Sequence, residues 1–520
     1  MPSMDPSSRM SYAAAGLLST AAGVAAGHLA AALTDPAASP VLAVGSTVID
    51  LTPTPLKEWA VRELGNADKP VLLASVAVGT LVLAGLAGVV ARRSARLGAV
   101  VLLALVALAG ALALHRPAAR PVDVVPALVS AAIGLGVFAA SVRSLRTASA
   151  TATFATALPG SPEAVLAARA SRRGLLLGAG AVAAFSGLAA ATGQWVIRTG
   201  TQIADIVLPR AAKPLPPLPA GLEKAHAGIS ALRTPTDRFY RVDTNLVVPR
   251  VNLDSWRLRI DGDVRQELTL TYDDLLAMPL VERDITLTCV SNEVGGKYVG
   301  AARWLGVPLM DLLDQAGIGT KADQLLSTAV DGFTISTPLD VVRDGRDVLV
   351  AIGMNGEPLP ADHGFPARLV TPGVYGFVGA TKWLERLTLT TYAAKQAYWT
   401  KRKWATDAPI KVSARIDTPK PFSTVDAGQT VIGGVAWAQH RGIARVEVRI
   451  DGGAWQTARL GPDAGLDYWR QWYLPWDAPK GRHLVAVRAV TKDGDVQTAV
   501  RRTPFPDGSS GIQEVVVNVS

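Results

Sequence analysis

The hydrophobic and polar positions of this 520-residue chain follow one pattern in its first part and another in the rest. Up to about residue 200, Ala, Leu, Val and Gly form long apolar stretches with few charges. A helix that crosses a membrane needs about 20 such residues. The stretches of nearly this length or more are 11–33, 70–91, 97–114, 122–142 and 174–195. The pattern predicts a membrane region with about five transmembrane helices over residues 1–197.

The arginines near these stretches gather on one side of the predicted membrane. They are Arg9, Arg92, Arg93, Arg96, Arg143, Arg146, Arg169, Arg172 and Arg173. Because cytoplasmic loops carry the excess of Lys and Arg, we predict a cytoplasmic N-terminus and an extracytoplasmic location for everything after residue 196. The shorter, proline-bounded apolar segment at 39–53 is then an interfacial or re-entrant part of the first external loop.

Two features of the predicted spans allow more than one interpretation. Arg172 and Arg173 precede an apolar run rich in Gly and Ala, so they resemble a twin-arginine export signal or are only the positive charges of a cytoplasmic loop. His28 and His115 fall near the outer ends of spans. Two such histidines can ligate a haem between helices, but a histidine at a span end more often lies at the membrane interface.

The second part of the chain alternates short apolar and polar runs that are separated by turn residues. Residues 198–229 are rich in proline, which predicts an extended linker. Residues 230–405 mix short strands with short helices, one of them closed by Gly317, and predict an α+β domain. Residues 406–520 contain about seven alternating strands between turns such as Asp451-Gly452, which predicts an immunoglobulin-like β-sandwich.

Charge and cysteine content exclude several classes of protein. The net charge of +9 is compatible with nucleic-acid binding, but the Lys and Arg residues are scattered and form no basic helix or strip. The single cysteine, Cys289, excludes an intramolecular disulfide and a metal site built from several cysteines. It ends the apolar run in DITLTCVSNEVGG. Most lone cysteines are small buried hydrophobes, so the thiol alone does not indicate a reaction.

Three stretches of the second part, in this order, look like one family. They are TLTCVSNEVGG with the following ARWLGVPLMDLLDQAG, then HGFPARLVTPGVYGFVGATKWLERL, then VEVRIDGGAWQTARL. They resemble the sulfite-oxidase family of molybdenum-cofactor enzymes over roughly residues 230–520. With its apolar first part, the chain looks like a membrane-anchored actinobacterial-type variant. The resemblance implies a sulfite-oxidase-like molybdopterin-binding domain over 230–405 and, over 406–520, a sandwich of the kind that often mediates dimers.

The resemblance also implies roles for individual residues. Molybdenum would be held by the dithiolene of molybdopterin and by the sulfur of Cys289, since a thiolate suits a transition metal. Asn292 completes the Cys-x-x-Asn motif, and we predict that both residues are catalytic. The implied cofactor-binding residues are Asp237, Tyr240, Arg241, His363, Arg368, Ala380, Thr381 and Lys382. In the alternative interpretation, these residues form surface salt bridges or packed loops and the thiol is a buried hydrophobe.

Several positions depart from the pattern of the family. Sulfite oxidases carry arginines after the Cys-x-x-Asn motif, where this chain has Glu293 and Val294. They also carry a tyrosine before an S-x-P-L segment, where this chain has Phe333. The loss of cations disfavours an anionic substrate such as sulfite. Arg415 is either a further catalytic cation or a surface residue of a strand.

These observations lead to one preferred hypothesis and two alternatives. We predict a membrane-anchored, extracytoplasmic molybdopterin-dependent oxidoreductase that carries out two-electron oxygen-atom transfer on a small or protein-bound substrate. Reduction of an S-oxide or N-oxide is favoured. The alternatives are a sulfite dehydrogenase and a non-catalytic, membrane-tethered binding protein with a degenerate cofactor domain. Because the chain has no b5-type haem segment with HPGG, we expect a separate electron-transfer partner, either a haem protein or a quinone-linked one, and we consider a homodimer through the C-terminal domain.

Overall fold

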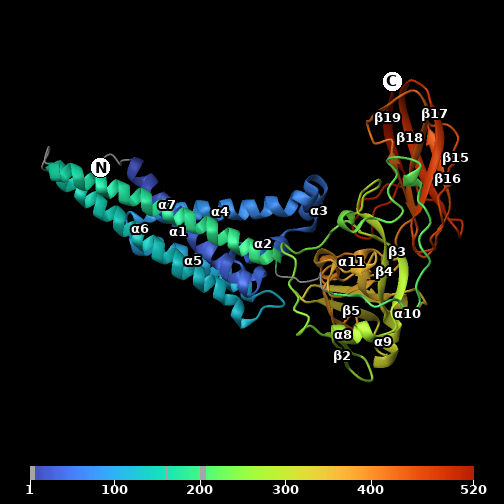
Figure 1. The fold of residues 1–520 in the computed structure, drawn as a ribbon, viewed down its shortest axis with the longest axis horizontal. Helices are drawn as coiled ribbons and strands as arrows, with labels where there is room; N and C mark the ends of the chain where they lie inside the picture. The colour runs from blue at the N-terminus through green and yellow to red at the C-terminus, as the bar shows by residue number, and fades with distance from the viewer. Residues whose placement is uncertain (1–5, 158–161, 200–205) are drawn as a thin grey trace. The chain divides into compact units, whose positions relative to one another are not determined.

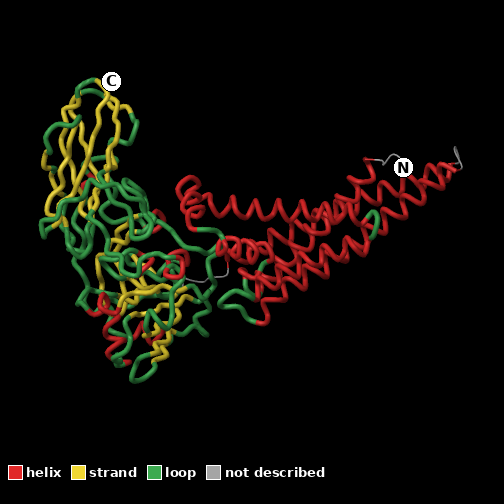
Figure 2. Tube along the Cα trace, turned by 180° about the vertical axis from the view of Figure 1, so that it is seen from behind, coloured by secondary structure: helices red, strands yellow, loops and turns green. Residues whose placement is uncertain are grey.

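The structure, a computed structural model, describes residues 6–157, 162–199 and 206–520 (Figure 1). The chain divides into two compact units, Met1–Gln202 with Thr244–Arg250 and Ile203–Asp243 with Val251–Ser520. Long helices make up the first, which we call the helical unit, whereas strands and loops dominate the second, which we call the strand-rich unit (Figure 2).

The apolar first part of the chain folds into a set of helices joined by short connections. They are α1 (Pro6–Leu33), α2 (Pro40–Leu51), α3 (Thr54–Leu64), α4 (Asp68–Ala91), α5 (Ala95–Leu114), α6 (Val125–Ala157) and α7 (Pro162–Thr199), with the 3-10 turns η1 (Pro36–Ala38), η2 (Gly65–Ala67) and η3 (Pro121–Val124). Polar residues mark where helices begin: the Ser94 hydroxyl accepts a hydrogen bond from the N–H of Leu97 (3.3 Å) at the start of α5.

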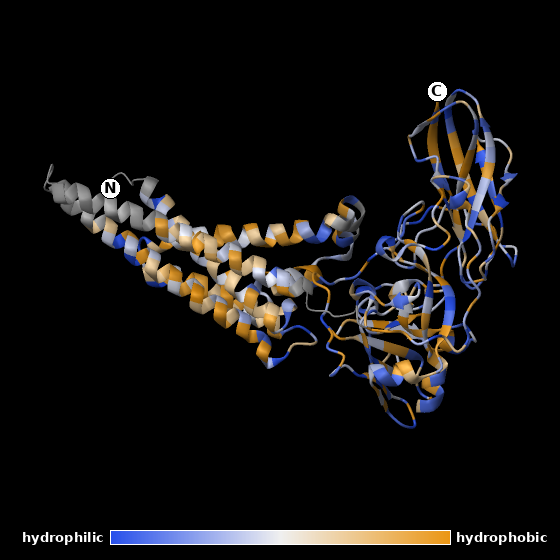
Figure 3. Cartoon of the chain, viewed as in Figure 1, coloured by the Kyte–Doolittle hydropathy of each residue, from blue (hydrophilic) through white to orange (hydrophobic). Residues whose placement is uncertain are grey.

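Among the described residues, four helices are long and apolar enough to cross a membrane (Figure 3). They are Ser8–Leu33, Asp68–Ala91, Ala95–Leu114 and Pro121–Ala148, which correspond to the first four predicted spans. The fifth predicted span falls in α7, which is not one of these four, and the side chains of Arg172 and Arg173 lie outside the described residues. The segment predicted as interfacial or re-entrant forms α2, an apolar helix of 12 residues.

Glycines allow α1 and α4 to approach each other closely. A Cβ atom on Gly16 would lie 2.1 Å from the carbonyl oxygen of Ala84. A Cβ atom on Gly88 would lie 2.1 Å from the carbonyl oxygen of Tyr12. Small residues at such contacts are typical of helices that pack inside a membrane, where backbone proximity replaces the hydrophobic effect as the source of attraction.

The strand-rich unit begins with an α+β region. Its elements are β1 (Leu258–Gly262), β2 (Leu268–Leu270), α8 (Tyr272–Ala277), β3 (Val281–Thr288), β4 (Val299–Pro308), α9 (Leu309–Ala316), β5 (Gln324–Ala329), β6 (Thr334–Pro338), α10 (Leu339–Arg343), β7 (Leu349–Met354), β8 (Glu357–Pro358), β9 (Arg368–Val370), α11 (Gly376–Gly379) and β10 (Leu384–Thr390). The 3-10 turns of this region are η4 (Leu222–Lys224), η5 (Thr236–Arg238), η6 (Ala361–His363) and η7 (Thr400–Arg402).

Two sheets organise this region. One has the order β2-β1-β10-β5-β6, and the other has the order β3-β4-β7-β8 with β9 beside β7. Helix α9 buries Leu309, Leu312 and Leu313 in the core. It ends, as predicted, at Gly317, whose φ of 72° needs a glycine and whose N–H donates to the carbonyl of Leu313 (2.8 Å).

The last part of the chain forms two sheets that face each other across one core. Its strands are β11 (Ser413–Thr418), β12 (Thr424–Val425), β13 (Gly428–Trp437), β14 (Ile443–Ile450), β15 (Gln456–Thr457), β16 (Arg459–Leu460), β17 (Arg470–Ala478), β18 (Gly481–Thr491) and β19 (Gln513–Val519). The sheet orders are β11-β13-β17-β16 and β12-β19-β18-β14-β15. Ile432, Trp472 and Val487 from the two sheets share the core. This is a β-sandwich, and its immunoglobulin-like character stays a prediction.

Loops of the sandwich hold strand β3 along its outer edge. The N–H of Thr286 donates to the carbonyl of Asp467 (2.9 Å), and its hydroxyl accepts the N–H of Trp469 (2.9 Å). The amide of Gln439 donates to the carbonyl of Thr286 and to the hydroxyl of Thr288, both at 3.0 Å. The end of β3, where the single cysteine follows, is therefore fixed by both parts of the strand-rich unit.

Hydrogen bonds attach the described part of the predicted linker, residues 206–229, to the rest of the strand-rich unit. The N–H of Leu215 donates to the Glu282 carboxylate (2.8 Å) in the α+β region. The N–H of Leu222 donates to the side chain of Gln471 (2.8 Å) in the sandwich. Residues 206–229 therefore belong to the strand-rich unit, because its side chains satisfy the backbone donors that an isolated extended segment would leave to water.

Candidate functional site

Cys289 follows β3 directly and lies in a loop that its backbone helps to close. Its N–H donates to the carbonyl of Tyr298, and its carbonyl accepts the N–H of Asn292, both at 3.0 Å. The buried side-chain oxygen of Asn292 accepts the N–H of Tyr298 (2.8 Å). The hydroxyl of Ser509, from the sandwich, donates to the carbonyl of Asn292 (2.6 Å). Asn292, predicted as catalytic, therefore holds the shape of the loop around the thiol.

The environment of the thiol disfavours a free thiolate. Cys289 is partly exposed as a residue, but burial raises the pKa of its thiol, while Ser291 and Lys382 lower it to a smaller extent. The described residues contain no group of three or more His, Cys, Asp or Glu side chains that could hold a metal ion. A metal bound here would have this sulfur as its protein ligand and would take its remaining ligands from a cofactor or solvent.

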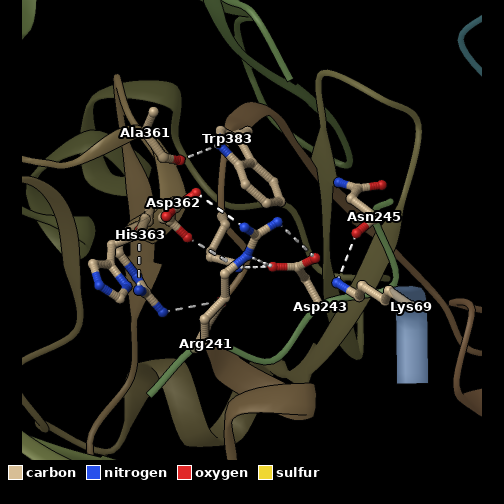
Figure 4. Close-up of polar contacts among 11 residues, drawn as sticks. Lys69, Arg241, Asp243, Asn245, Ala361, Asp362, His363 and Trp383 are labelled. Carbon is tan, nitrogen blue, oxygen red and sulfur yellow. Dashed lines mark hydrogen bonds and ion pairs between the residues drawn. The ribbon is translucent and has the colours of Figure 1, made fainter. Parts of the chain in front are cut away.

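A cluster of charged side chains lies in the same region (Figure 4). Arg241 reaches between two carboxylates, with its Nε 2.8 Å from Asp243 Oδ2 and its Nη1 3.0 Å from Asp362 Oδ1. Lys382 binds the Asp243 carboxylate as well, with its Nζ 2.5 Å from Asp243 Oδ2. The same ammonium group donates to the backbone carbonyl of Asp362 (3.2 Å). Asp243 thus holds the two cations side by side.

Arg368 carries positive charge without a matching carboxylate among its described hydrogen bonds. It is 5% exposed and donates to the carbonyls of His363 (3.0 Å) and Ala380 (3.4 Å). Its guanidinium carbon lies 5.0 Å from the ring centroid of Trp304. Its buried Nε has no partner, and burial lowers the pKa of Arg368 to about 10. A buried cation in this state is costly unless an anion joins it.

Burial and the positive charge of this cluster also lower the pKa values of the neighbouring Lys382 and His363. Burial lowers the pKa of Lys382 to about 8, although Asp243 acts in the opposite direction. Burial, together with Arg368 and Lys382, lowers the pKa of His363 to about 4. The ring of His363 is therefore neutral at pH 7, and its Nε2 lies 3.3 Å from the carbonyl of Thr236. A phosphate in this region would raise both pKa values.

Tyr240 lies near both the thiol and the cation cluster. Its ring stacks on Phe239 with 5.2 Å between centroids. Burial raises the pKa of the Tyr240 hydroxyl, the Cys289 thiolate raises it further, and Arg368 lowers it. The phenol therefore stays protonated at any ordinary pH and is able to donate a hydrogen bond.

Three other predicted residues have different surroundings. Asp237 is exposed on η5. Ala380 and Thr381 are implied cofactor-binding residues, but the N–H of Ala380 already donates to the carbonyl of Gly376 (3.0 Å) at the end of α11. The hydroxyl of Thr381 is buried and lies 2.5 Å from that of Ser327. These contacts shape the loop that leads to Lys382.

Arg415, predicted as a further catalytic cation, is tied into the protein. Its Nε lies 2.6 Å from Asp417 Oδ1, which neutralises its charge. Its Nη2 donates to the hydroxyl of Ser230 (2.9 Å), and its Nη1 donates to the carbonyl of Gly296 (3.0 Å). Arg415 thus supports the loop that follows the cysteine, and its catalytic role stays a prediction.

The sequence did not lead us to Asp243, Asp362 or Trp304. Asp243 stands two residues after Arg241, and Asp362 directly precedes His363. Acidic neighbours of predicted phosphate-binding residues were therefore a usable signal for both carboxylates. Trp304 left no such signal, because a tryptophan in an apolar strand is expected to be a core residue whether or not a cation lies on its ring.

Comparisons with known proteins bear on this site. Residues 245–399 match the family model described as an oxidoreductase molybdopterin binding domain. Human mitochondrial sulfite oxidase is 34% identical over 309 residues, which cover 50% of this chain and 56% of the human protein. Residues 245–399 of this chain are a molybdopterin-binding oxidoreductase domain, and the chain is similar to sulfite oxidase. Its cofactor is the molybdenum cofactor, as the resemblance implied.

Two other known proteins are similar to about half of this chain. The inducible NADH nitrate reductase 2 of Glycine max is 29% identical over 341 residues, covering 53% of this chain and 37% of the plant protein. The crystal structure of the sulfane dehydrogenase SoxCD from Paracoccus pantotrophus is 27% identical with a TM-score of 0.49, covering 55% of this chain and 83% of that one. The chain spans about half the length of the human sulfite oxidase and less of the nitrate reductase.

The described residues fit a molybdopterin cofactor. Cys289 offers one sulfur. Three cations, Arg241, Arg368 and Lys382, face only two carboxylates, so the region has positive charge to spare for a phosphate. The buried, unpartnered Nε of Arg368 is a donor that still needs an acceptor.

The lowered pKa of His363 makes the stability of the cofactor-free protein dependent on pH. The native state binds this proton only near pH 4, whereas the unfolded state binds it near pH 6.5. Stability from this group is therefore complete above about pH 6.5 and falls as the pH drops, by about 2 kcal/mol between pH 7 and pH 5. The unfolding midpoint of His363→Gln, measured by tryptophan fluorescence, should therefore fall less than that of the wild type between pH 7 and pH 5. His226→Gln is the control, and an equal fall in His363→Gln and wild type would contradict the prediction.

Proposed function

We propose that this protein is a membrane-anchored molybdenum-cofactor oxidoreductase that carries out two-electron oxygen-atom transfer, with reduction of an S-oxide or N-oxide as the preferred reaction. One combination of features carries the proposal. A single thiol, Cys289, ends a strand that both parts of the strand-rich unit hold in place, and the buried cation Arg368 in the same unit lacks a counter-charge among its described hydrogen bonds. The molybdopterin-binding domain supplies the chemical class.

Different residues of this chain would hold the molybdenum and the pterin of the cofactor. Cys289 would supply the protein ligand to molybdenum, while Arg241, Arg368 and Lys382 would hold the phosphate of the pterin. His363, neutral at pH 7, would donate to or accept from the pterin without adding charge. The bound cofactor supplies the two-electron redox chemistry. Tyr240, held as a protonated phenol near the thiol, is the donor from this chain that is best placed to orient a substrate oxygen.

The charges around the thiol loop favour a neutral substrate. Glu293 and Lys297 are both exposed in this loop, so its formal charges balance. Arg415, the cation that supports the loop, is already paired with Asp417. A sulfoxide or an N-oxide carries no net charge and meets no electrostatic mismatch here, whereas a sulfite dianion would meet four residues whose formal charges sum to zero.

Sulfite oxidation is the second candidate function. It is favoured by the 34% identity to human mitochondrial sulfite oxidase and by the exposed Lys297, which is able to attract an anion. A non-catalytic, membrane-tethered binding protein is disfavoured, because a degenerate cofactor domain has no reason to retain Cys289 together with three clustered cations.

We also propose the finer organisation predicted from the sequence. Five spans over residues 1–197 place the N-terminus inside and the catalytic domain outside the cytoplasm. The linker of residues 198–229 leads to a cofactor domain over 230–405 and an immunoglobulin-like domain over 406–520, with export by the twin-arginine route. Electrons pass to or from a separate haem or quinone-linked partner, and the last domain is available for dimer formation.

Metal analysis joined to a substrate screen tests the proposal. Full-length protein from a host that makes the cofactor is expected to contain about one molybdenum per chain. We expect the protein to oxidise a reduced redox dye when a sulfoxide or an N-oxide is the substrate. It should reduce the oxidised dye more slowly when sulfite is the substrate. Protein without molybdenum would contradict the enzyme proposal, and faster turnover of sulfite would favour the second candidate.

A further inference from the structure

The helical unit contains a cavity of about 600 Å³. Its walls come from α1, α2, α4, α7 and the segment Thr244–Arg250, which follows Asp243 directly in the chain. They are mostly small or aliphatic, with Ala21, Ala25, Leu42, Leu73 and Leu246 among them. Cavities of this size hold small molecules of several rings or a ring with a short chain.

A second, smaller cavity borders the first. Its volume is about 180 Å³, and it lies among α1, α2, α4, α5 and α6. Val24 and Val41 line both cavities, so the two are neighbours. The smaller one is again mostly apolar, and it includes the hydroxyl of Ser130, which is buried without a partner. Together they offer a wide compartment and a narrow apolar extension.

One side of the larger cavity is polar but carries no formal charge. The Nδ1 atom of His28 lies 3.1 Å from the hydroxyl of Ser39. The side chain of Gln194 hydrogen-bonds to the same ring. None of the described residues that line this cavity is Asp, Glu, Lys or Arg. The polar side is therefore suited to a neutral group with carbonyl or hydroxyl oxygens rather than to an ionic headgroup.

We propose that these two cavities bind a neutral, lipid-soluble quinone or quinol. Its oxygens would hydrogen-bond with His28, Ser39 and Gln194, and its apolar tail would occupy the smaller cavity. Among the described residues, four of the surrounding helices, α1, α4, α5 and α6, are apolar and long enough to cross a membrane, so a ligand would reach the site from the lipid phase. This inference concerns a separate site and does not rest on the reaction proposed for the molybdenum cofactor.

Two glycines of α7 provide a matched test. Gly187 lines the larger cavity, and no atom lies within 4 Å of a Cβ built on it, so a side chain there enters open space. Gly180, earlier in the same helix, also has no atom within 4 Å of such a Cβ but does not line either cavity. Gly187→Phe should therefore obstruct the site, whereas Gly180→Phe makes the same chemical change elsewhere on the helix.

The probe is 2-methyl-1,4-naphthoquinone, added to the full chain in lipid nanodiscs and measured by equilibrium dialysis. We expect about one quinone to bind per chain. Gly187→Phe and His28→Leu should each reduce the affinity for the quinone at least tenfold, whereas Gly180→Phe should leave the affinity unchanged. Equal binding to Gly187→Phe and wild type would overturn the proposal, as would a tightly held phospholipid that the quinone does not displace. Cys289→Ser should bind the quinone normally, so failure of the molybdenum chemistry and failure of this site are distinguishable.

Discussion

Cys289→Ser is expected to lose turnover by about 10³-fold or more, the scale on which removal of an essential catalytic group acts. A serine hydroxyl is a harder ligand that loses its proton far less readily than a thiol, so it is a poor replacement at molybdenum. The variant should nevertheless fold. The hydrogen bonds that close the loop use the backbone N–H and carbonyl of Cys289 and not its sulfur. Turnover with a redox dye and the visible absorption of a sulfur-to-molybdenum bond are the measurements.

Ser291→Ala is the graded control for this prediction. Ser291 hydrogen-bonds to the sulfur of Cys289 through both its backbone and its side chain. Loss of the hydroxyl should change turnover less than tenfold, because the backbone bond remains. Full activity in Cys289→Ser, with molybdenum still present, would show that the sulfur is not a ligand.

Much of the fold could be predicted because the relevant signals are local. The helices at the first four predicted spans follow from apolar length, and the end of α9 follows from Gly317. The attachment of β3 to the sandwich could not be predicted, since Gln439 reaches Thr286 across 153 positions of the chain. Hydrogen bonds of this kind depend on how two separately patterned regions meet, and single-sequence periodicity carries no information about that.

The same limit applies to the site. The resemblance identified Cys289, Arg241, Arg368 and Lys382, but it said nothing about which carboxylates they contact. Lys382 and Asp243 are 139 positions apart, so their pairing became visible only in three dimensions. For Arg415, the sequence left a catalytic cation and a surface residue of a strand as alternatives, and its pairing with Asp417, two residues later, became visible only in the structure.

Arg368→Met is expected to lower the molybdenum-cofactor content at least tenfold. Arg241 and Lys382 already share two carboxylates, so Arg368 supplies the surplus charge of the cluster. Methionine keeps an apolar chain against the ring of Trp304, but it removes the charge and the donors. Arg368→Lys restores the charge without the planar fork and should recover only part of the content. Molybdenum per chain, measured together with pterin fluorescence after release, checks both variants.

Arg386→Met is the matched control, since Arg386 lies in β10 of the same region, is 43% exposed and pairs with Asp261 at 3.4 Å. Its loss should leave the cofactor content unchanged, because an exposed pair contributes little. The stability of the cofactor-free protein separates a binding role from a structural one. Arg368→Met removes a buried charge that has no carboxylate partner, which favours the cofactor-free fold, but it leaves two carbonyls unpaired. A variant that keeps its unfolding midpoint while losing cofactor establishes Arg368 as a ligand of the phosphate, and unchanged cofactor content would contradict that role.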